Sequence, residues 1–143
     1  MDAAITKNRY WIKTALTIGI SLVWLLNGLF CKLLNLVPRH QQIVARILGE
    51  EYAPFLTKAI GISEIAMFIW IISGIKPRFC AITQMLVIAV MNTLEFILVP
   101  DLLLFGRVNS ILALVLIAAI FINEFVLISH KGTKATKNFL CFL

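Results

Sequence analysis

Charged residues are scarce in this chain: they make up 14% of its 143 residues, whereas hydrophobic residues make up 61%. A soluble globular domain carries about 25% charged residues, so the composition argues against a water-soluble fold. The net charge of +6 does not indicate nucleic-acid binding, because the basic residues gather at the ends of apolar runs and no basic soluble domain is present. The sequence therefore predicts an integral membrane protein whose main partner is the lipid bilayer, with no nucleic-acid partner.

Cysteine and histidine are also rare, with three and two residues. No two cysteines form a CxxC pair, which argues against a thiol:quinone oxidoreductase whose thiols exchange with each other. His40 and His130 are expected on opposite sides of the membrane, so they cannot hold one haem between them. The Glu-x-x-His spacing of a di-iron bundle, P-loops, dinucleotide fingerprints and zinc-ligand spacings are absent. The sequence contains no self-contained cofactor site and no metal site.

Long apolar runs are what the chain does have. A crossing helix needs roughly 20 predominantly apolar residues, and four windows qualify, at about residues 14–37, 53–75, 79–99 and 104–128. The runs are continuous rather than alternating in polarity, which argues against a β-barrel. The first run is too long for the apolar part of a signal peptide and should remain as a helix. We predict an all-α, four-helix membrane bundle that forms one domain from residue 1 to 143.

The segment 38–52, between the first two runs, shows a helical pattern of a different kind. Its apolar residues fall on one face and its polar residues elsewhere, which predicts an amphipathic helix lying in the interface or capping the bundle mouth. Pro38 fits as its start and Gly49 as its end. Residues 129–143 are predicted to form a polar tail.

Basic residues flank the runs unevenly. They precede the first run, occupy the second connection and follow the fourth run, as Lys7, Arg9, Lys13, Lys76, Arg78, Lys131, Lys134 and Lys137. By the positive-inside rule these segments share the cytoplasmic side. Both termini are therefore expected to be cytoplasmic, with residues 38–52 on the outer side.

Two carboxylates, Glu64 and Glu95, lie inside the second and third runs. An acid at membrane depth is costly and is a functional-site hypothesis by default. Lys32 is expected near the depth of Glu95, close enough to pair with it, whereas Glu64 has no partner defined by the sequence. Glu124, with its neighbour Asn123, is expected to reach the interface by snorkelling.

The polar residues of the runs predict a cavity in the outer half of the bundle. The candidates for ligand binding or proton exchange are Glu64, Glu95, Lys32, Asn92, Asn27 and Trp24, with His40, Asn109 and Gln84 in secondary roles. The alternative is that these side chains only hold the helices together by hydrogen bonds. The sequence assigns no catalytic residue.

An ordered set of short motifs resembles the DoxX-like family of small four-helix membrane proteins. The set comprises Trp24-Leu-Leu-Asn27-Gly28, Pro38-Arg39-His40, Gly61-Ile-Ser-Glu64, Lys76-Pro77-Arg78, and Met91-Asn92 with Glu95. The resemblance covers about residues 10–125. It implies a compact four-helix fold in a bacterial cytoplasmic membrane and an association with quinone-linked or redox-stress functions, and it leaves open whether the chain is an enzyme.

Three functional hypotheses follow. The first is a membrane subunit that binds a quinone or a similar lipid-soluble molecule, with Glu64 as its proton acceptor or hydrogen-bond partner. The second is a non-enzymatic scaffold whose amphipathic segment docks a membrane or periplasmic protein. The third is a small transporter or proton pathway, ranked last because the inner half of the bundle offers few polar groups.

Overall fold

The computed structural model describes residues 2–103 and 108–127, and both described stretches are predominantly helical. The elements in chain order are α1 (Asp2–Leu25), η1 (Leu26–Leu33), α2 (Pro38–Leu48), α3 (Ala53–Ser73), α4 (Pro77–Leu98), η2 (Pro100–Leu102), α5 (Val108–Phe121) and η3 (Ile122–Val126). Four helices are long and apolar enough to cross a membrane: Lys7–Leu33, Ala53–Ser73, Pro77–Leu98 and Val108–Val126. The prediction of four spanning helices with an amphipathic helix between the first two is confirmed. The predicted tail, 129–143, and residues 104–107 and 128 of the fourth window lie outside the described residues.

The first helix differs most from its predicted bounds. It begins at Asp2 rather than near Thr14, because lysine and arginine continue a helix almost as well as apolar residues do. It ends at Leu33, before the predicted Val37. Asn35 adopts the left-handed conformation with φ of 51°, and Pro38 disfavours helical backbone in the residue before it.

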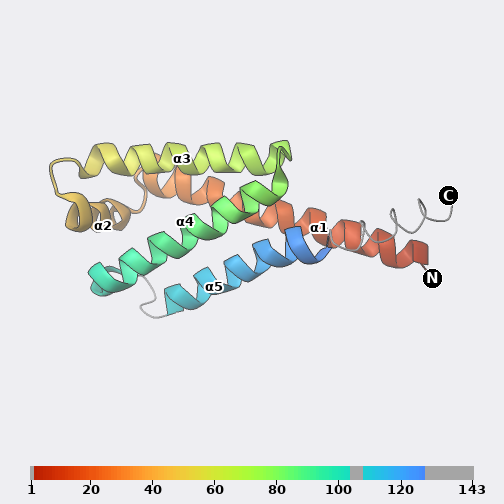
Figure 1. Ribbon diagram of the computed structural model, residues 1–143. Helices are drawn as coiled ribbons and strands as arrows, with labels where there is room; N and C mark the ends of the chain where they lie inside the picture. The colour runs from red at the N-terminus through yellow and green to blue at the C-terminus, as the bar shows by residue number, and fades with distance from the viewer. Residues whose placement is uncertain (1, 104–107, 128–143) are drawn as a thin grey trace.

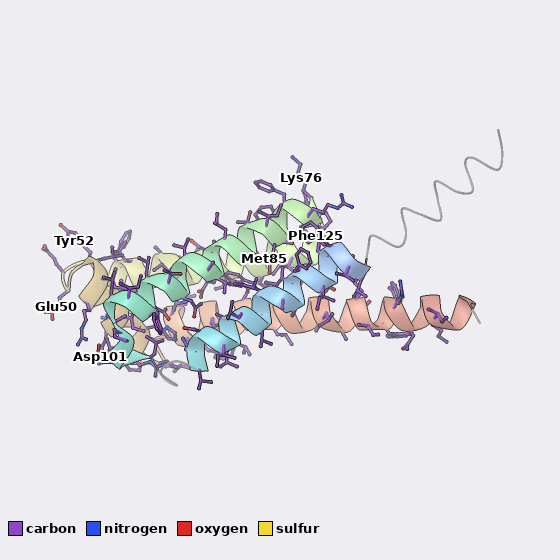
Figure 2. All side chains as sticks on the ribbon, turned by 60° about the horizontal axis from the view of Figure 1, so that its bottom comes forward. Glu50, Tyr52, Lys76, Met85, Asp101 and Phe125 are labelled. Atoms are coloured by element: carbon purple, nitrogen blue, oxygen red, sulfur yellow. The ribbon has the colours of Figure 1, made fainter. Side chains whose placement is uncertain are left out.

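The helices pack as two neighbouring pairs. In Figure 1, α3 runs beside α1 and η1, α5 runs beside α4, and α2 closes one end of the bundle. We call this end the α2 end and the opposite end, where α3 turns into α4, the N-terminal end. Figure 2 shows Glu50, Tyr52 and Asp101 at the α2 end, Lys76 and Phe125 at the N-terminal end, and Met85 between them. The start of α1 extends beyond the N-terminal end of the other helices.

The core is small and the outer surface is apolar. Ile20, Trp24 and Ile120 are each at most 6% exposed and belong to one cluster shared by α1, α4 and α5. Large apolar side chains such as Phe55 and Ile97 are instead 74% and 67% exposed. Exposure of this kind over four spanning helices fits contact with lipid tails. Because lipid tails are as apolar as leucine, the helices associate through close packing and interhelical hydrogen bonds.

The closest packing is between the first and second spanning helices, where Gly28 of η1 faces Gly61 of α3. A Cβ atom added at Gly28 would lie 2.7 Å from the carbonyl oxygen of Gly61, and one added at Gly61 would lie 2.8 Å from that of Gly28. Only residues without a side chain permit this approach. Glu64 Cβ lies beside Gly28 and Lys32 Cβ lies beside Gly61, so the crossing brings these two charged residues together.

The amphipathic helix α2 is attached from two sides. Its apolar residues Ile43 and Val44 are buried, and α2 packs on α3 and η1. On its exposed side, the Arg46 Nη1 atom donates to the Asp101 Oδ2 atom of η2 at 2.5 Å. This hydrogen bond holds the pKa of the Asp101 carboxyl below its usual value. Since both side chains are exposed, added salt weakens this attachment readily.

Candidate functional site

The Lys32 ammonium group and the Glu64 carboxylate form a buried ion pair between η1 and α3. The side chains are 8% and 13% exposed. The predicted pairing of Lys32 with Glu95 is wrong, since Lys32 donates to the Oε1 atom of Glu64. The Oε2 atom of Glu64 is buried without a hydrogen-bond partner among the described residues. The pair neutralises both charges but leaves one oxygen of the carboxylate without a hydrogen-bond donor.

The π-helical winding of η1 explains why Lys32 faces the bundle. In η1 and just after it, backbone bonds link residues five or more apart, such as the Leu34 N–H to the Leu29 carbonyl. More residues then fit in each turn than in an α-helix, so side chains four positions apart stay on one face. Trp24, Gly28 and Lys32 are accordingly all buried.

Three more ionisable residues surround this pair, and together the five form what we call the α2-end cluster: Lys32, Arg39, His40, Glu64 and Glu95. The charges of Lys32, Arg39 and Glu64 all act on Glu95, which is half-buried. The Nε atom of Arg39 is buried without a partner in the described part of the chain. The structure thus brings Glu64, Glu95 and Lys32 into the same part of the bundle as His40 of α2.

His40 lies in α2, where burial and the nearby charges of Lys32 and Arg39 lower its pKa from 6.5 to about 4. We expect its imidazole to stay neutral down to about pH 5. Folding then opposes protonation, so the stability that His40 contributes is complete above pH 6.5 and is lost as the pH falls toward 4. Nuclear magnetic resonance titration of the His130→Gln variant in micelles isolates the His40 signal. A midpoint near 6.5 would contradict this placement of His40.

A buried hydrogen bond lies near the middle of the bundle. The Trp24 Nε1 atom donates to the Gln84 Oε1 atom at 3.0 Å, linking α1 to α4. The Gln84 amide nitrogen lies 3.5 Å from the Cys80 sulfur. Two predicted site residues therefore meet here, below the α2-end cluster, and the bond separates that cluster from the N-terminal end.

The remaining predicted site residues are three asparagines. The Asn92 side chain donates to the Ile88 carbonyl of its own helix at 3.0 Å. This hydrogen bond stays within α4 and does not link it to another helix. Asn27 and Asn109 are half-buried, and no contact in the described residues joins either of them to the cluster.

A cavity lies at the N-terminal end, beyond the Trp24–Gln84 bond. It has a volume of about 250 Å³. Its lining combines apolar side chains with polar ones from all four spanning helices: Lys13, Thr17, Ile20, Trp70, Ile71, Gly74, Pro77, Cys80, Ala81, Gln84, Ile120, Asn123 and Glu124. The sequence had predicted a cavity in the other half of the bundle, and of its candidate residues only Gln84 lines this one.

Glu124 and Asn123 are buried, so the expectation that they snorkel to the interface is wrong. They are 5% and 8% exposed and lie in η3, a second π-helical segment. Asn123 donates to the Thr17 hydroxyl at 3.1 Å, and the Glu124 Oε2 atom lies 3.8 Å from the Lys13 Nζ atom. These contacts tie the last turns of the fourth spanning helix to α1.

One sequence signal pointed to this cavity. Lys13, Thr17, Ile20 and Trp24 fall at i, i+4, i+7 and i+11, which places them on one face of an α-helix. That face carries two polar residues in a helix otherwise apolar enough to span a membrane, so it predicts a contact with polar groups of another helix.

Comparison with known proteins gives one match. The model of the DoxX-like family matches residues 21–122 of the chain, a stretch that contains the α2-end cluster, the Trp24–Gln84 bond and much of the cavity lining. No curated protein and no solved structure matches.

Proposed function

The chain belongs to the DoxX-like family, and we propose that it is a multi-pass membrane protein that binds a quinone or a similar lipid-soluble molecule in the cavity at the N-terminal end. The observation that carries this proposal is the composition of the cavity. A quinone head needs apolar walls and a few hydrogen-bonding groups, which is the usual make-up of a small-molecule site. Ile20, Ile71 and Ile120 supply the walls, whereas Gln84 and Glu124 supply polar groups.

The size of the cavity fits this class of ligand. A cavity of about 150 Å³ is enough to hold benzene, so about 250 Å³ accommodates one substituted ring. An isoprenoid tail would leave the cavity toward the lipid. The α2-end cluster, by contrast, is packed around an ion pair and the Gly28–Gly61 crossing, which leaves less room for a ring.

Binding of a short-chain ubiquinone to the purified protein in detergent tests the proposal. We expect saturable binding that Cys80→Phe abolishes, because Cys80 is 3% exposed and lines the cavity. Ile82→Phe is the matched control, since it adds the same ring on the same helix at a side chain that is 51% exposed. Size-exclusion profiles and thermal transitions establish that both variants fold.

The same titration separates the two possible positions of the ligand. The sequence-based site at Glu64 stays a prediction, and Glu64→Gln tests it directly. Binding lost in Glu64→Gln and retained in Cys80→Phe would move the ligand to the α2 end. Absence of saturable binding to the unmodified protein would overturn the quinone proposal as a whole.

We propose a bacterial cytoplasmic membrane as the location, with the N-terminal end of the bundle on the cytoplasmic side. Lys7 and Arg9 of α1 lie at the same end as Lys76 and Arg78 of the α3–α4 turn, and the positive-inside rule places such a group in the cytoplasm. Labelling of single cysteines introduced at Lys76 and at Glu50 with a membrane-impermeant reagent, in intact cells, checks this orientation. Only the cysteine at position 50 should react.

A proton pathway is the second candidate function, because polar groups occur along the whole bundle. The reason for ranking transport last, a shortage of polar groups near the cytoplasmic side, does not hold: Thr17, Asn123 and Glu124 line the cavity there. Proton flux into proteoliposomes, measured with an enclosed pH dye, tests this function. Flux no faster than in protein-free vesicles would exclude it.

A further inference from the structure

Two hydrogen-bond acceptors of residues that line the cavity have no partner among the described residues. Glu124 is 5% exposed and its Oε1 atom has no hydrogen-bond partner within the described ranges. Asn123 is 8% exposed and its Oδ1 atom is likewise unpartnered. Its amide nitrogen donates to the Thr17 hydroxyl. Buried polar atoms are almost always paired, so two unpaired acceptors on adjacent residues of a cavity wall point to a ligand that donates.

No donor of the described residues reaches either acceptor. The Lys13 Nζ atom lies 3.8 Å from the Glu124 Oε2 atom, which is beyond hydrogen-bond distance. The Trp24 indole N–H is already donated to Gln84. A half-turn about the last side-chain bond of Glu124 exchanges its two oxygens, so either one can face the cavity.

We propose that the cavity selects the reduced form of its ligand, a hydroquinone, over the oxidised quinone, with Glu124 and Asn123 as the accepting groups. This proposal rests on the proposed function. A quinone presents two carbonyl oxygens, which accept hydrogen bonds and gain nothing from a carboxylate. A hydroquinone presents two hydroxyl groups, which donate.

Calorimetric titration under nitrogen, with ubiquinone-1 and ubiquinol-1 as separate probes, tests the selectivity. We expect ubiquinol-1 to bind about tenfold more tightly or better. The dimethyl ether of the same hydroquinone, which has the ring but no hydroxyl donors, should lose this advantage. It controls for the difference in ring electronics between the two oxidation states.

Glu124→Gln identifies the accepting group. Its amide can donate as well as accept, so we expect the preference for ubiquinol-1 to fall to about threefold or less. Glu50→Gln makes the same chemical change at an exposed position of the α2 end and should leave the preference unchanged. Asn123→Leu serves as a second probe if Glu124→Gln folds poorly, since it removes the neighbouring acceptor and should also reduce the preference.

The outcomes distinguish this inference from the proposal on which it rests. Equal affinity for ubiquinone-1 and ubiquinol-1, or a preference that survives in both Glu124→Gln and Asn123→Leu, would overturn the selectivity and leave quinone binding standing. If neither ubiquinone-1 nor ubiquinol-1 bound to the unmodified protein, the quinone proposal itself would be overturned.

Discussion

Glu64→Ala is expected to lower the free energy of unfolding by about 3–5 kcal/mol, because it leaves the ammonium group of Lys32 buried without a partner. Lys32 is only 7% exposed, and no other acidic group of the described residues lies within 4.0 Å of it. Removal of one member of a buried pair therefore costs far more than the pair itself contributes. Reversible unfolding in mixed micelles with increasing dodecyl sulfate, followed by tryptophan fluorescence, measures the change.

A double variant shows whether the cost comes from the isolated charge. Lys32→Met combined with Glu64→Leu replaces the pair with apolar side chains of similar length, and such replacements are often neutral or stabilising. We expect it to regain most of the stability that Glu64→Ala loses. Glu51→Ala is the control for loss of a carboxylate at an exposed position and should stay within about 0.5 kcal/mol of the unmodified chain.

Two results would contradict the buried ion pair. One is a Glu64→Ala variant as stable as Glu51→Ala, which would mean that Lys32 reaches water or lipid headgroups. The other is a double variant no more stable than Glu64→Ala, which would place the loss in packing around Glu64 rather than in the charge of Lys32.

The spanning helices and their order were predictable because they depend on composition over long windows. Twenty apolar residues in a row specify a membrane crossing almost regardless of their order, and the three connections are marked by Pro38, Pro77 and Pro100 at the starts of the following elements. The ends of the first helix were less predictable. A basic residue such as Lys7 is compatible with helix or with an irregular segment, and the apolar pattern does not distinguish them.

Side-chain partners were harder to predict, because they depend on helix rotation to within a fraction of a turn. The structure buries Thr57 and Gly61 of α3, and Gly61 lies against the first spanning helix. In η1 and η3 the π-helical winding shifts that rotation. Lys32, expected beside Glu95, pairs with Glu64 instead, and Glu124 lies inside the bundle rather than at the interface.

The position of the cavity could not be read from polarity alone. The α2 end carries more charged residues, and the sequence therefore favoured it for a ligand. Lys32 and Glu64 instead satisfy each other there, and the glycine crossing draws the helices together. At the N-terminal end Glu124 and Lys13 remain 3.8 Å apart, and the lining residues leave an open volume between them.

Gly28→Ala is expected to destabilise the protein by at least about 1–3 kcal/mol, since the added methyl group overpacks the crossing of η1 and α3. Its Cβ atom would lie 2.7 Å from the Gly61 carbonyl oxygen, 2.9 Å from the Glu64 Cβ atom and 3.1 Å from the Ile65 backbone nitrogen. Two of these atoms are backbone, so relief requires α1 and α3 to separate. The same unfolding measurement in mixed micelles applies.

Gly19→Ala is the matched control, because it makes the same substitution two turns earlier in the same spanning helix, where an added Cβ has nothing within 4 Å. Alanine favours a helix over glycine by up to about 1 kcal/mol, so Gly19→Ala should be neutral or slightly stabilising. If Gly28→Ala matched Gly19→Ala, the close crossing would be contradicted. Gly61→Ala crowds the same contact from the other side, so the double variant with Gly28→Ala should cost less than the sum of the two single changes. Strict additivity would mean that the two glycines do not share one contact, and the crossing would then no longer account for how Lys32 reaches Glu64.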